Sequence, residues 1–244
     1  MMSFFGGFKV RRLVHKLENC DIKIRLQAAE ELGNMGESGA VEPLIQTLFK
    51  TENIEIIHIR VIQSLGKLRD PRATTSLLKI LYGKLDSVTF STIVRLRAAE
   101  ALGEIGDPRS IRPLLQFLKL KGRKVGENEG ELISKVREAI VQIGKLHLNP
   151  LLELLKDNNE YIRIEVAQAL KEIGNPLSVP KFIEALDDLN YVVRIIAAEA
   201  LGVIGDESSI IVLRSSLKDV NRDVRQAAKD ALEAIQNRNR DAKK

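Results

Sequence analysis

Apolar residues recur along this chain at intervals of three and four positions, the spacing of helices that bury one face. Ile24, Ala28, Leu32 and Met35 form one such stripe, and the segment that starts at Val41 forms another. No run of alternating β-branched residues is bounded by hairpin dipeptides, so strands are not expected. The pattern therefore predicts an all-α protein.

The helical pattern itself repeats along the chain. The block at 24–33 returns with few changes at 94–103 and 193–202, and weaker copies lie at 57–66, 162–170 and 224–232. The same apolar position of each copy is occupied by Leu32, Leu65, Leu102, Ile140, Leu170, Leu201 and Leu232. These positions lie 30 to 38 residues apart, a period typical of stacked repeat arrays.

Each repeat is predicted to hold a first helix, A, and a second helix, B. Glycine is expected to end most B helices, at Gly36, Gly106, Gly144, Gly174 and Gly205. Four prolines fall early in A helices and three in turns, where the missing N–H does least harm. The repeats are expected at about 9–36, 39–69, 71–106, 108–144, 148–174, 176–205 and 207–237, after an aromatic segment at 1–8 and before a polar basic tail at 238–244.

A single helix pair of this kind does not bury both of its apolar faces, so neighbouring pairs must stack. Paired small residues, such as Ala28 and Ala29 or Ala197 and Ala198, allow the B helices to approach closely. The predicted fold is a right-handed α-solenoid of about seven helix pairs.

The repeated block resembles the HEAT-repeat superfamily, and in particular the short phycobilisome-lyase-like (PBS lyase) HEAT repeats. The residues that carry the resemblance run from Val94-Arg95 to Gly106-Asp107 and from Val193-Arg194 to Gly205-Asp206. The resemblance covers about residues 9–237 and implies a scaffold fold with a concave face lined by B helices. It also implies possible help in attaching bilin chromophores to phycobiliproteins, which is one alternative function.

In that family an Asp in the turn within a repeat pairs with the B-helix Arg and links neighbouring repeats. The resemblance implies such a structural ladder at Asp157/Arg163, Asp188/Arg194 and Asp219/Arg225, each pair six residues apart. The middle repeats depart from this pattern, with Glu52/His58, Thr89/Arg95 and Glu127/Ile133 at the same spacing. A continuous ladder is therefore not expected through residues 50–140.

Charge is distributed unevenly along the chain. Residues 1–126 carry 21 Lys and Arg against 13 Asp and Glu, whereas the remaining residues carry 17 against 20. The candidate partner-binding groove on the B helices consists of Arg60, Arg95, Arg97 and Lys135, beside an acidic row that includes Glu30, Glu100 and Glu138. Two interpretations stay open: a groove that attracts an acidic protein segment, or rows that neutralise each other as weak exposed ion pairs.

Two other segments are candidates for partner contact. An insertion at 120–131 carries Arg123 and Lys124 among several glycines, and it is either a functional loop or a tolerated insertion. Phe4, Phe5 and Phe8 precede a basic helix that starts near Lys9. The favoured interpretation is that these phenylalanines cover the open end of the stack. Docking to a partner is the alternative, and contact of this terminus with a membrane surface is not favoured.

Residues for catalysis or metal binding are sparse. The chain has three histidines and one cysteine, with no metal-binding spacing, phosphate-binding loop or oriented nucleophile pair. No cofactor, metal or catalytic residue is therefore expected. Nucleic-acid backbone binding is a further alternative, because the sequence pI is about 9.3.

No membrane span or signal peptide is evident, so a cytoplasmic protein is expected. The function predicted from the sequence is a non-catalytic scaffold or assembly factor that binds another protein on the B-helix face of the solenoid.

Overall fold

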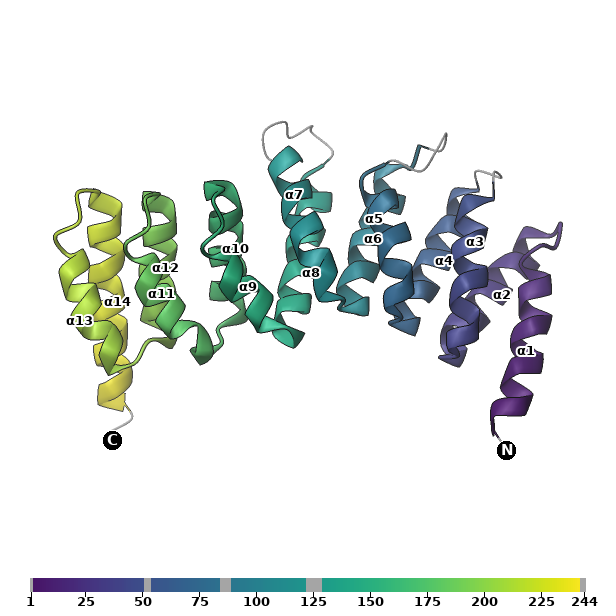
Figure 1. The fold of residues 1–244 in the computed structure, drawn as a ribbon, viewed down its shortest axis with the longest axis horizontal. Helices are drawn as coiled ribbons and strands as arrows, with labels where there is room; N and C mark the ends of the chain where they lie inside the picture. Colours follow the sequence, from purple (N-terminus) through teal and green to yellow (C-terminus); the bar gives the residue numbers. More distant parts are fainter. Residues whose placement is uncertain (1, 51–53, 84–88, 122–128, 242–244) are drawn as a thin grey trace. The chain divides into compact units, whose positions relative to one another are not determined.

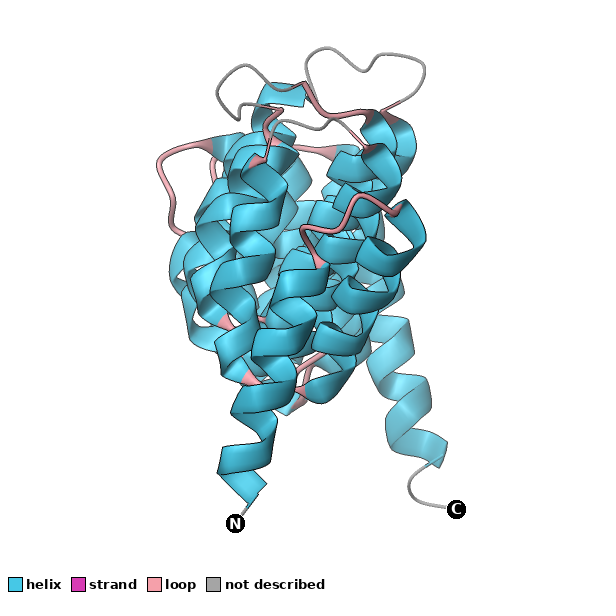
Figure 2. Cartoon of the chain, turned by 90° about the vertical axis from the view of Figure 1, so that its right-hand side faces the viewer, coloured by secondary structure: helices cyan, strands magenta, loops and turns pink. Residues whose placement is uncertain are grey.

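A computed structural model describes residues 2–50, 54–83, 89–121 and 129–241. Within these residues the chain forms fourteen α-helices, four short 3₁₀ helices and no strand, which confirms the predicted all-α repeat fold built from helix pairs (Figures 1 and 2). The A helices are α1 (Met2–Lys16), α3 (Val41–Phe49), α5 (Thr74–Leu81), α7 (Ile111–Lys121), α9 (Leu148–Leu154), α11 (Val179–Ala185) and α13 (Glu207–Ser216). The B helices are α2 (Ile22–Met35), α4 (Glu55–Leu68), α6 (Thr92–Ile105), α8 (Gly130–Leu146), α10 (Glu160–Ile173), α12 (Tyr191–Ile204) and α14 (Arg222–Asp241).

Short polar side chains begin most of these helices in the way the sequence favours. Asn159 and Asn190 accept hydrogen bonds from the first backbone N–H groups of α10 and α12. Four 3₁₀ turns, η1 (Ser38–Ala40), η2 (Pro71–Ala73), η3 (Pro108–Ser110) and η4 (Pro176–Ser178), lead into A helices. Proline at the first position of η2, η3 and η4 agrees with the expected role of Pro71, Pro108 and Pro176.

Two of the predicted glycine stops behave differently in the structure. Gly36, Gly106 and Gly174 take the left-handed conformation after their helices, but Gly144 is buried inside α8, which continues to Leu146. Gly205 follows α12 with a φ of −66° and is therefore not a left-handed cap. At the end of α4 a non-glycine residue, Arg69, takes the left-handed conformation instead, with a φ of 52°.

The chain forms two compact units, unit 1 (Met1–Leu146) and unit 2 (His147–Lys244). In unit 1 the B helices α2, α4, α6 and α8 pack side by side in chain order, and in unit 2 α10, α12 and α14 do the same (Figure 1). The core of each unit lies between its A and B helices, where Leu32, Leu102 and Phe182 are fully buried. Each unit is thus a stack whose apolar faces are covered by neighbours.

Both terminal helices extend into segments that the sequence assigned to a tail or an aromatic segment. Helix α1 starts at Met2 and so includes most of residues 1–8, and α14 runs to Asp241. Near the end of α14, Arg238 donates hydrogen bonds to the carbonyl oxygens of Gly202, Val203 and Gly205. These carbonyls lie at the C-terminus of α12, where a cation is favourable.

Two features that define other protein classes are absent from the described residues. None of them combines the length and the apolar character that a membrane crossing needs. The described His, Cys, Asp and Glu side chains form no group of three or more suited to a metal ion.

Candidate protein-binding surface

Three of the predicted groove residues come together on the side of the B helices of unit 1 that faces away from the A helices. Arg60, Arg97 and Lys135 occupy the same register on α4, α6 and α8, which pack against one another. Each of them has an acidic neighbour. Arg60 lies 3.5 Å from Glu30, Arg97 lies 2.7 Å from Glu100, and Lys135 lies 2.7 Å from Glu138 and 3.8 Å from Glu100. The surface is therefore made of alternating charges rather than a purely basic groove.

An open hollow of about 360 Å³ lies among these ion pairs. Its lining consists of Gln63, Arg97, Glu100, Ala101, Glu104, Lys135, Glu138, Ala139 and Gln142. Burial, and secondarily the charge of Glu100, raises the pKa of Glu104 above its ordinary value. The hydrogen bond to Glu138 raises the pKa of Lys135. We call this hollow, together with Arg60, the α4–α6–α8 surface.

Two exposed isoleucines near the N-terminal ends of α4 and α6 were not identified by the sequence analysis. Ile56 is 53% exposed and Ile93 is 56% exposed, and they occupy equivalent positions in successive repeats. The equivalent positions in the flanking repeats hold Lys23 and Glu131. Apolar residues at a position that is charged in the two flanking repeats are the signal that could have revealed them.

Arg95 does not join the other three groove residues, although it lies only two positions before Arg97. Two residues on a helix differ by about 200° in direction, so Arg95 points toward the A helices. Its Nε donates to the carbonyl oxygen of Leu81 at 2.9 Å, and its guanidinium lies 5.6 Å from the centre of the Phe117 ring. Its Nη1 lies 3.4 Å from Glu129. Arg95 therefore connects the A and B layers of unit 1.

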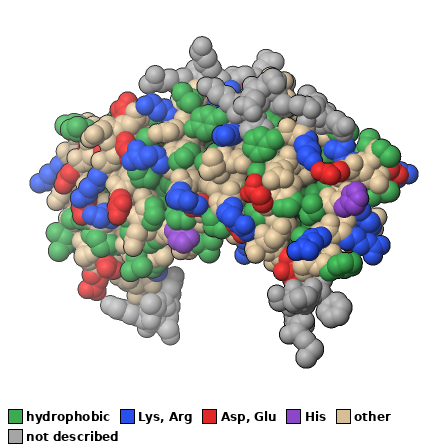
Figure 3. Space-filling view, turned by 45° about the vertical axis from the view of Figure 1, so that its right-hand side comes forward, with side chains coloured by type: hydrophobic (Ala, Val, Ile, Leu, Met, Phe, Trp, Pro, Cys, Tyr) green, Lys and Arg blue, Asp and Glu red, His purple; other side chains and the backbone are tan. Residues whose placement is uncertain are grey.

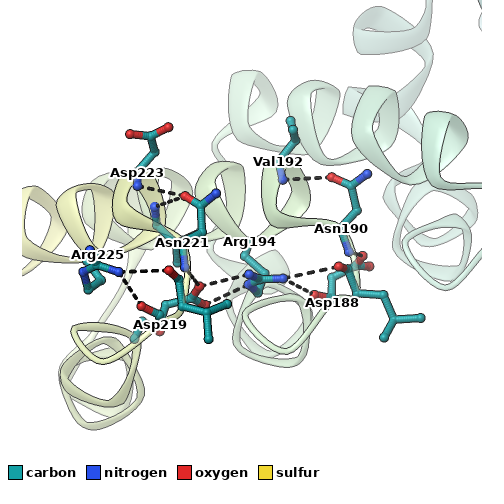
Figure 4. Close-up of polar contacts among 12 residues, drawn as sticks. Asp188, Asn190, Val192, Arg194, Asp219, Asn221, Asp223 and Arg225 are labelled. Carbon is teal, nitrogen blue, oxygen red and sulfur yellow. Dashed lines mark hydrogen bonds and ion pairs between the residues drawn. The ribbon is translucent and has the colours of Figure 1, made fainter.

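The ladder residues of unit 2 connect successive repeats (Figure 4). Arg163 donates to both carboxylate oxygens of Asp188 at 2.7 and 2.8 Å, and Arg194 does the same to Asp219 at 2.8 and 2.9 Å. Each arginine also donates through Nη1 to the backbone carbonyl of the Asp six residues before it, as Arg225 does to Asp219. The six-residue spacing thus marks a backbone contact, and the carboxylate contact reaches the next repeat.

The arginine–aspartate pairs of unit 2 shift the pKa values of their members. The hydrogen bond from Arg194 is the main cause that lowers the pKa of Asp219. The hydrogen bond to Asp188 correspondingly raises the pKa of Arg163. Both arginine side chains are only 12% exposed, so these are partly desolvated bidentate pairs.

Among the described residues of unit 1, a comparable contact occurs where the sequence suggested an interruption. Arg95 meets Glu129 of the next repeat, and Glu129 also accepts a hydrogen bond from Lys121 at 2.7 Å. Glu129 lies four residues before Ile133 instead of six, which is why the spacing pattern did not reveal this contact. In the preceding repeat, His58 occupies the position of the ladder arginine and is buried. The centre of its ring lies 5.3 Å from the centre of the Phe90 ring, in an edge-on arrangement.

Unit 2 has its own hollow beside the ladder. Lys156, Lys181 and Glu184 line it together with Asp188. Hydrogen bonds from Lys156 and Lys181 lower the pKa of Glu184 to about 2. The lysines are therefore engaged with a carboxylate of the same chain.

The remaining candidate residues are only partly described. Phe8 lies on α1 and is 76% exposed, so it does not cover the open end of the stack. Phe4 and Phe5 belong to α1, but their side chains lie outside the described part of the chain, as do Arg123 and Lys124 entirely. The free thiol of Cys20 is exposed.

Sequence comparison agrees with this architecture. A family model for HEAT repeats matches residues 10–92 and 148–233, and a model for the PBS lyase HEAT-like repeat matches residues 94–119. The chain belongs to the HEAT-repeat family. No curated protein sequence matches it.

Several solved structures are similar in fold. One is human deoxyhypusine hydroxylase in complex with glycerol, with 22% identity, a TM-score of 0.42, and coverage of 96% of this chain and 98% of that chain. Another is the complex of CpcE and CpcF of phycocyanin lyase from Nostoc sp., with 19% identity, a TM-score of 0.49, and coverage of 93% and 94%. A designed armadillo repeat protein has 21% identity, a TM-score of 0.33, and coverage of 93% and 99%.

Proposed function

We propose that the protein is a non-catalytic scaffold or assembly factor that binds another protein through the α4–α6–α8 surface. The observation that carries this proposal is the hollow among three B helices, lined by charged and amide side chains, with Ile56 and Ile93 exposed on the same helices. Packed helices hold these groups in place before binding, which lowers the entropic cost of association.

A binding partner can replace the ion pairs of this surface with pairs to its own charged side chains. Pairs between exposed side chains contribute only about 0–1 kcal/mol, so a partner that offers its own charges displaces them at small cost. Side chains of Arg60 and Arg97 are 38% exposed, and that of Glu138 is 47% exposed. The fitting partner is a protein segment that carries charges of both signs and apolar side chains for Ile56 and Ile93.

The charge-reversal variant Arg60→Glu, Arg97→Glu, Lys135→Glu tests this assignment. We expect it to lose the partners that crosslinking mass spectrometry identifies for the wild-type chain in native lysate, because each substitution places two like charges together. The matched control reverses three exposed charges in unit 2, Arg214→Glu, Lys218→Glu and Lys229→Glu. Equal partner capture by the groove variant and the wild type would refute the assignment.

A role in chromophore attachment is the second candidate, because residues 94–119 match the PBS lyase HEAT-like repeat. Incubation of the protein with a bilin and an apo-phycobiliprotein tests it by visible absorption. An unchanged rate of chromophore attachment removes this candidate. Arg123 and Lys124 stay proposed loop contacts for either function, and the cytoplasm stays the expected location.

A further inference from the structure

The excess positive charge of unit 1 lies on its A helices and not on the α4–α6–α8 surface. Helices α1, α3, α5 and α7 carry eight Lys and Arg side chains and one acidic side chain, Glu42. The four B helices of unit 1 carry nine basic side chains against seven acidic ones, close to balance. The charge asymmetry that the sequence showed is thus concentrated on one layer.

The A helices of unit 1 form one continuous layer. The turn η1 contacts both α1 and α3, and η2 contacts both α3 and α5. The hydroxyl of Tyr82, directly after α5, donates to the carbonyl oxygen of Pro113 in α7 at 2.8 Å. These contacts connect neighbouring A helices along unit 1, and Figure 1 shows the helices side by side.

Basic side chains occupy the outer side of this layer. On α1, Val10 and Leu13 are buried, whereas Arg11 and Arg12 are exposed. Lys79 on α5 and Arg112 on α7 are also exposed. We call these four residues, with Phe8, Phe49 and Leu120, the A-helix face. Figure 3 shows Lys and Arg, Asp and Glu, and apolar side chains interspersed on the side of the molecule that it presents.

Large apolar side chains accompany the basic residues on this layer. Phe8 is 76% exposed, Leu120 is 63% exposed and Phe49 is 37% exposed. Phe8 lies three and four positions before Arg11 and Arg12, so these side chains are neighbours on α1. Lys50 follows Phe49, and Lys119 and Lys121 flank Leu120. Of these cations, Lys50 pairs with Glu18 and Lys121 pairs with Glu129. Phe8, Phe49 and Leu120 each have at least one basic residue as a neighbour in the chain or on the helix.

We propose that the A-helix face of unit 1 binds the surface of a membrane that contains anionic lipids. Such a surface attracts Lys and Arg through its headgroups and accepts Phe and Leu side chains at the boundary of the acyl region. A nucleic-acid backbone would satisfy the cations but offers no apolar environment for Leu120. The A helices of unit 2 carry two basic and three acidic side chains, so the attraction is confined to unit 1.

This inference is independent of the proposed protein-binding function, because the two surfaces belong to different helix layers. It also extends beyond the N-terminus, where membrane contact was not favoured from the sequence. Phe8 alone is a weak anchor, and the structure adds Phe49, Leu120 and the basic residues of α5 and α7.

Sedimentation of the full chain with vesicles tests the proposal. We expect binding to vesicles of phosphatidylcholine mixed with phosphatidylserine, little binding to phosphatidylcholine alone, and weaker binding at higher salt. The variant Arg11→Glu, Arg12→Glu, Lys79→Glu should bind at least about tenfold more weakly. The control Arg60→Glu, Arg97→Glu, Lys135→Glu changes the net charge equally and should bind much more strongly than the A-helix variant. Equal loss in both variants would show nonspecific attraction and overturn the proposal, as would no binding of the wild type.

A fluorescence measurement tests the orientation separately. The chain has no tryptophan, so Leu120→Trp introduces a single reporter on the A-helix face, and Ile93→Trp introduces one on the outer side of the B helices. On addition of phosphatidylserine vesicles we expect a blue shift for Leu120→Trp and none for Ile93→Trp. A shift of both reporters, or of neither, contradicts the proposed face. Binding of single-stranded DNA that competes with the vesicles and leaves Leu120→Trp unshifted would assign the face to nucleic acid instead.

Discussion

At the scale of single residues, one arginine joins three parts of unit 2. Arg194 donates two hydrogen bonds to the carboxylate of Asp219 in the next repeat (Figure 4). It also donates to the backbone carbonyl of Asp188, which lies just before α12, the helix that carries Arg194. Asp219 in turn accepts a hydrogen bond from the backbone N–H of Asn221. The network fixes the turn within one repeat against the B helix of another, so it sets their register.

Removing this guanidinium should destabilise unit 2. We expect Arg194→Ala to lower the free energy of unfolding by about 1–3 kcal/mol, because it leaves a partly buried carboxylate without its charged partner. Arg214→Ala, which removes an exposed arginine from α13, is the control and should change stability little. Urea denaturation followed by circular dichroism measures both. A smaller effect for Arg194→Ala than for Arg214→Ala would contradict the structural role of the ladder.

His58 makes the stability of unit 1 sensitive to pH. Burial lowers the pKa of this imidazole, and the positive charge of Arg25 lowers it further, while Glu55 acts in the opposite direction. A group whose folded pKa is depressed binds more protons when unfolded, so its contribution to stability is present above the unfolded value of about 6.5 and lost as pH falls. We expect the wild type to lose more stability between pH 7 and pH 5 than His58→Gln, which remains neutral. Parallel losses measured by urea denaturation across that interval would disprove this.

At the scale of helices, glycine sets how closely two B helices approach. A Cβ at Gly202 of α12 would lie 2.9 Å from the Cα of Ala231 and 3.1 Å from its Cβ in α14. Gly33 of α2 faces Ser64 of α4 in the same way, and the Ser64 hydroxyl donates to the Ala29 carbonyl at 2.7 Å. Close contact between backbones therefore connects repeats in both units.

Gly202→Ala tests this contact. An alanine inside a helix ordinarily gains up to about 1 kcal/mol over glycine, but here we expect a net loss of about 1–3 kcal/mol because α12 and α14 must separate. Gly7→Ala in α1 is the matched control, since its Cβ would meet no atom within 4 Å. It should be neutral or stabilising in thermal denaturation. If both substitutions stabilise the protein, the close packing of α12 on α14 is wrong.

At the scale of the whole molecule, each helix pair depends mainly on its neighbours in the stack. Helix α14 covers α12, and α13 packs on α14 and α11. The two compact units also divide the chain between α8 and α9. Loss of one terminal helix should therefore be felt locally rather than throughout the chain.

Truncation before Arg222 provides the test at this scale. Removing α14 exposes buried residues of α12 and deletes the Arg238 contacts, so we expect a lower midpoint of thermal unfolding while unit 1 keeps its helices. Far-UV circular dichroism of the truncated chain measures the remaining helicity, and a variant truncated after Asp241 is the control. Complete loss of helicity would contradict the nearest-neighbour stack.

Much of the fold could be predicted because local signals agree with the stack. Apolar spacing, Asn or Asp before the helices, and proline early in the A helices each determine a local conformation. The positions of Arg60, Arg97 and Lys135 on one surface followed from the repeat register. Arg95 was predicted to join them because the spacing pattern alone does not show that its side chain points away from Arg97, toward the A helices.

The sequence by itself determined the seven helix pairs and the family, since a repeated period forces each pair to seal its apolar face against the next. Only the tertiary structure decided which charges meet. It paired Arg163 with Asp188, brought Glu129 to Arg95, and placed the excess positive charge of unit 1 on the A helices. The physical reason is that helix period is a property of neighbouring residues in the chain, whereas an ion pair or a surface depends on residues that approach each other only after the repeats have packed.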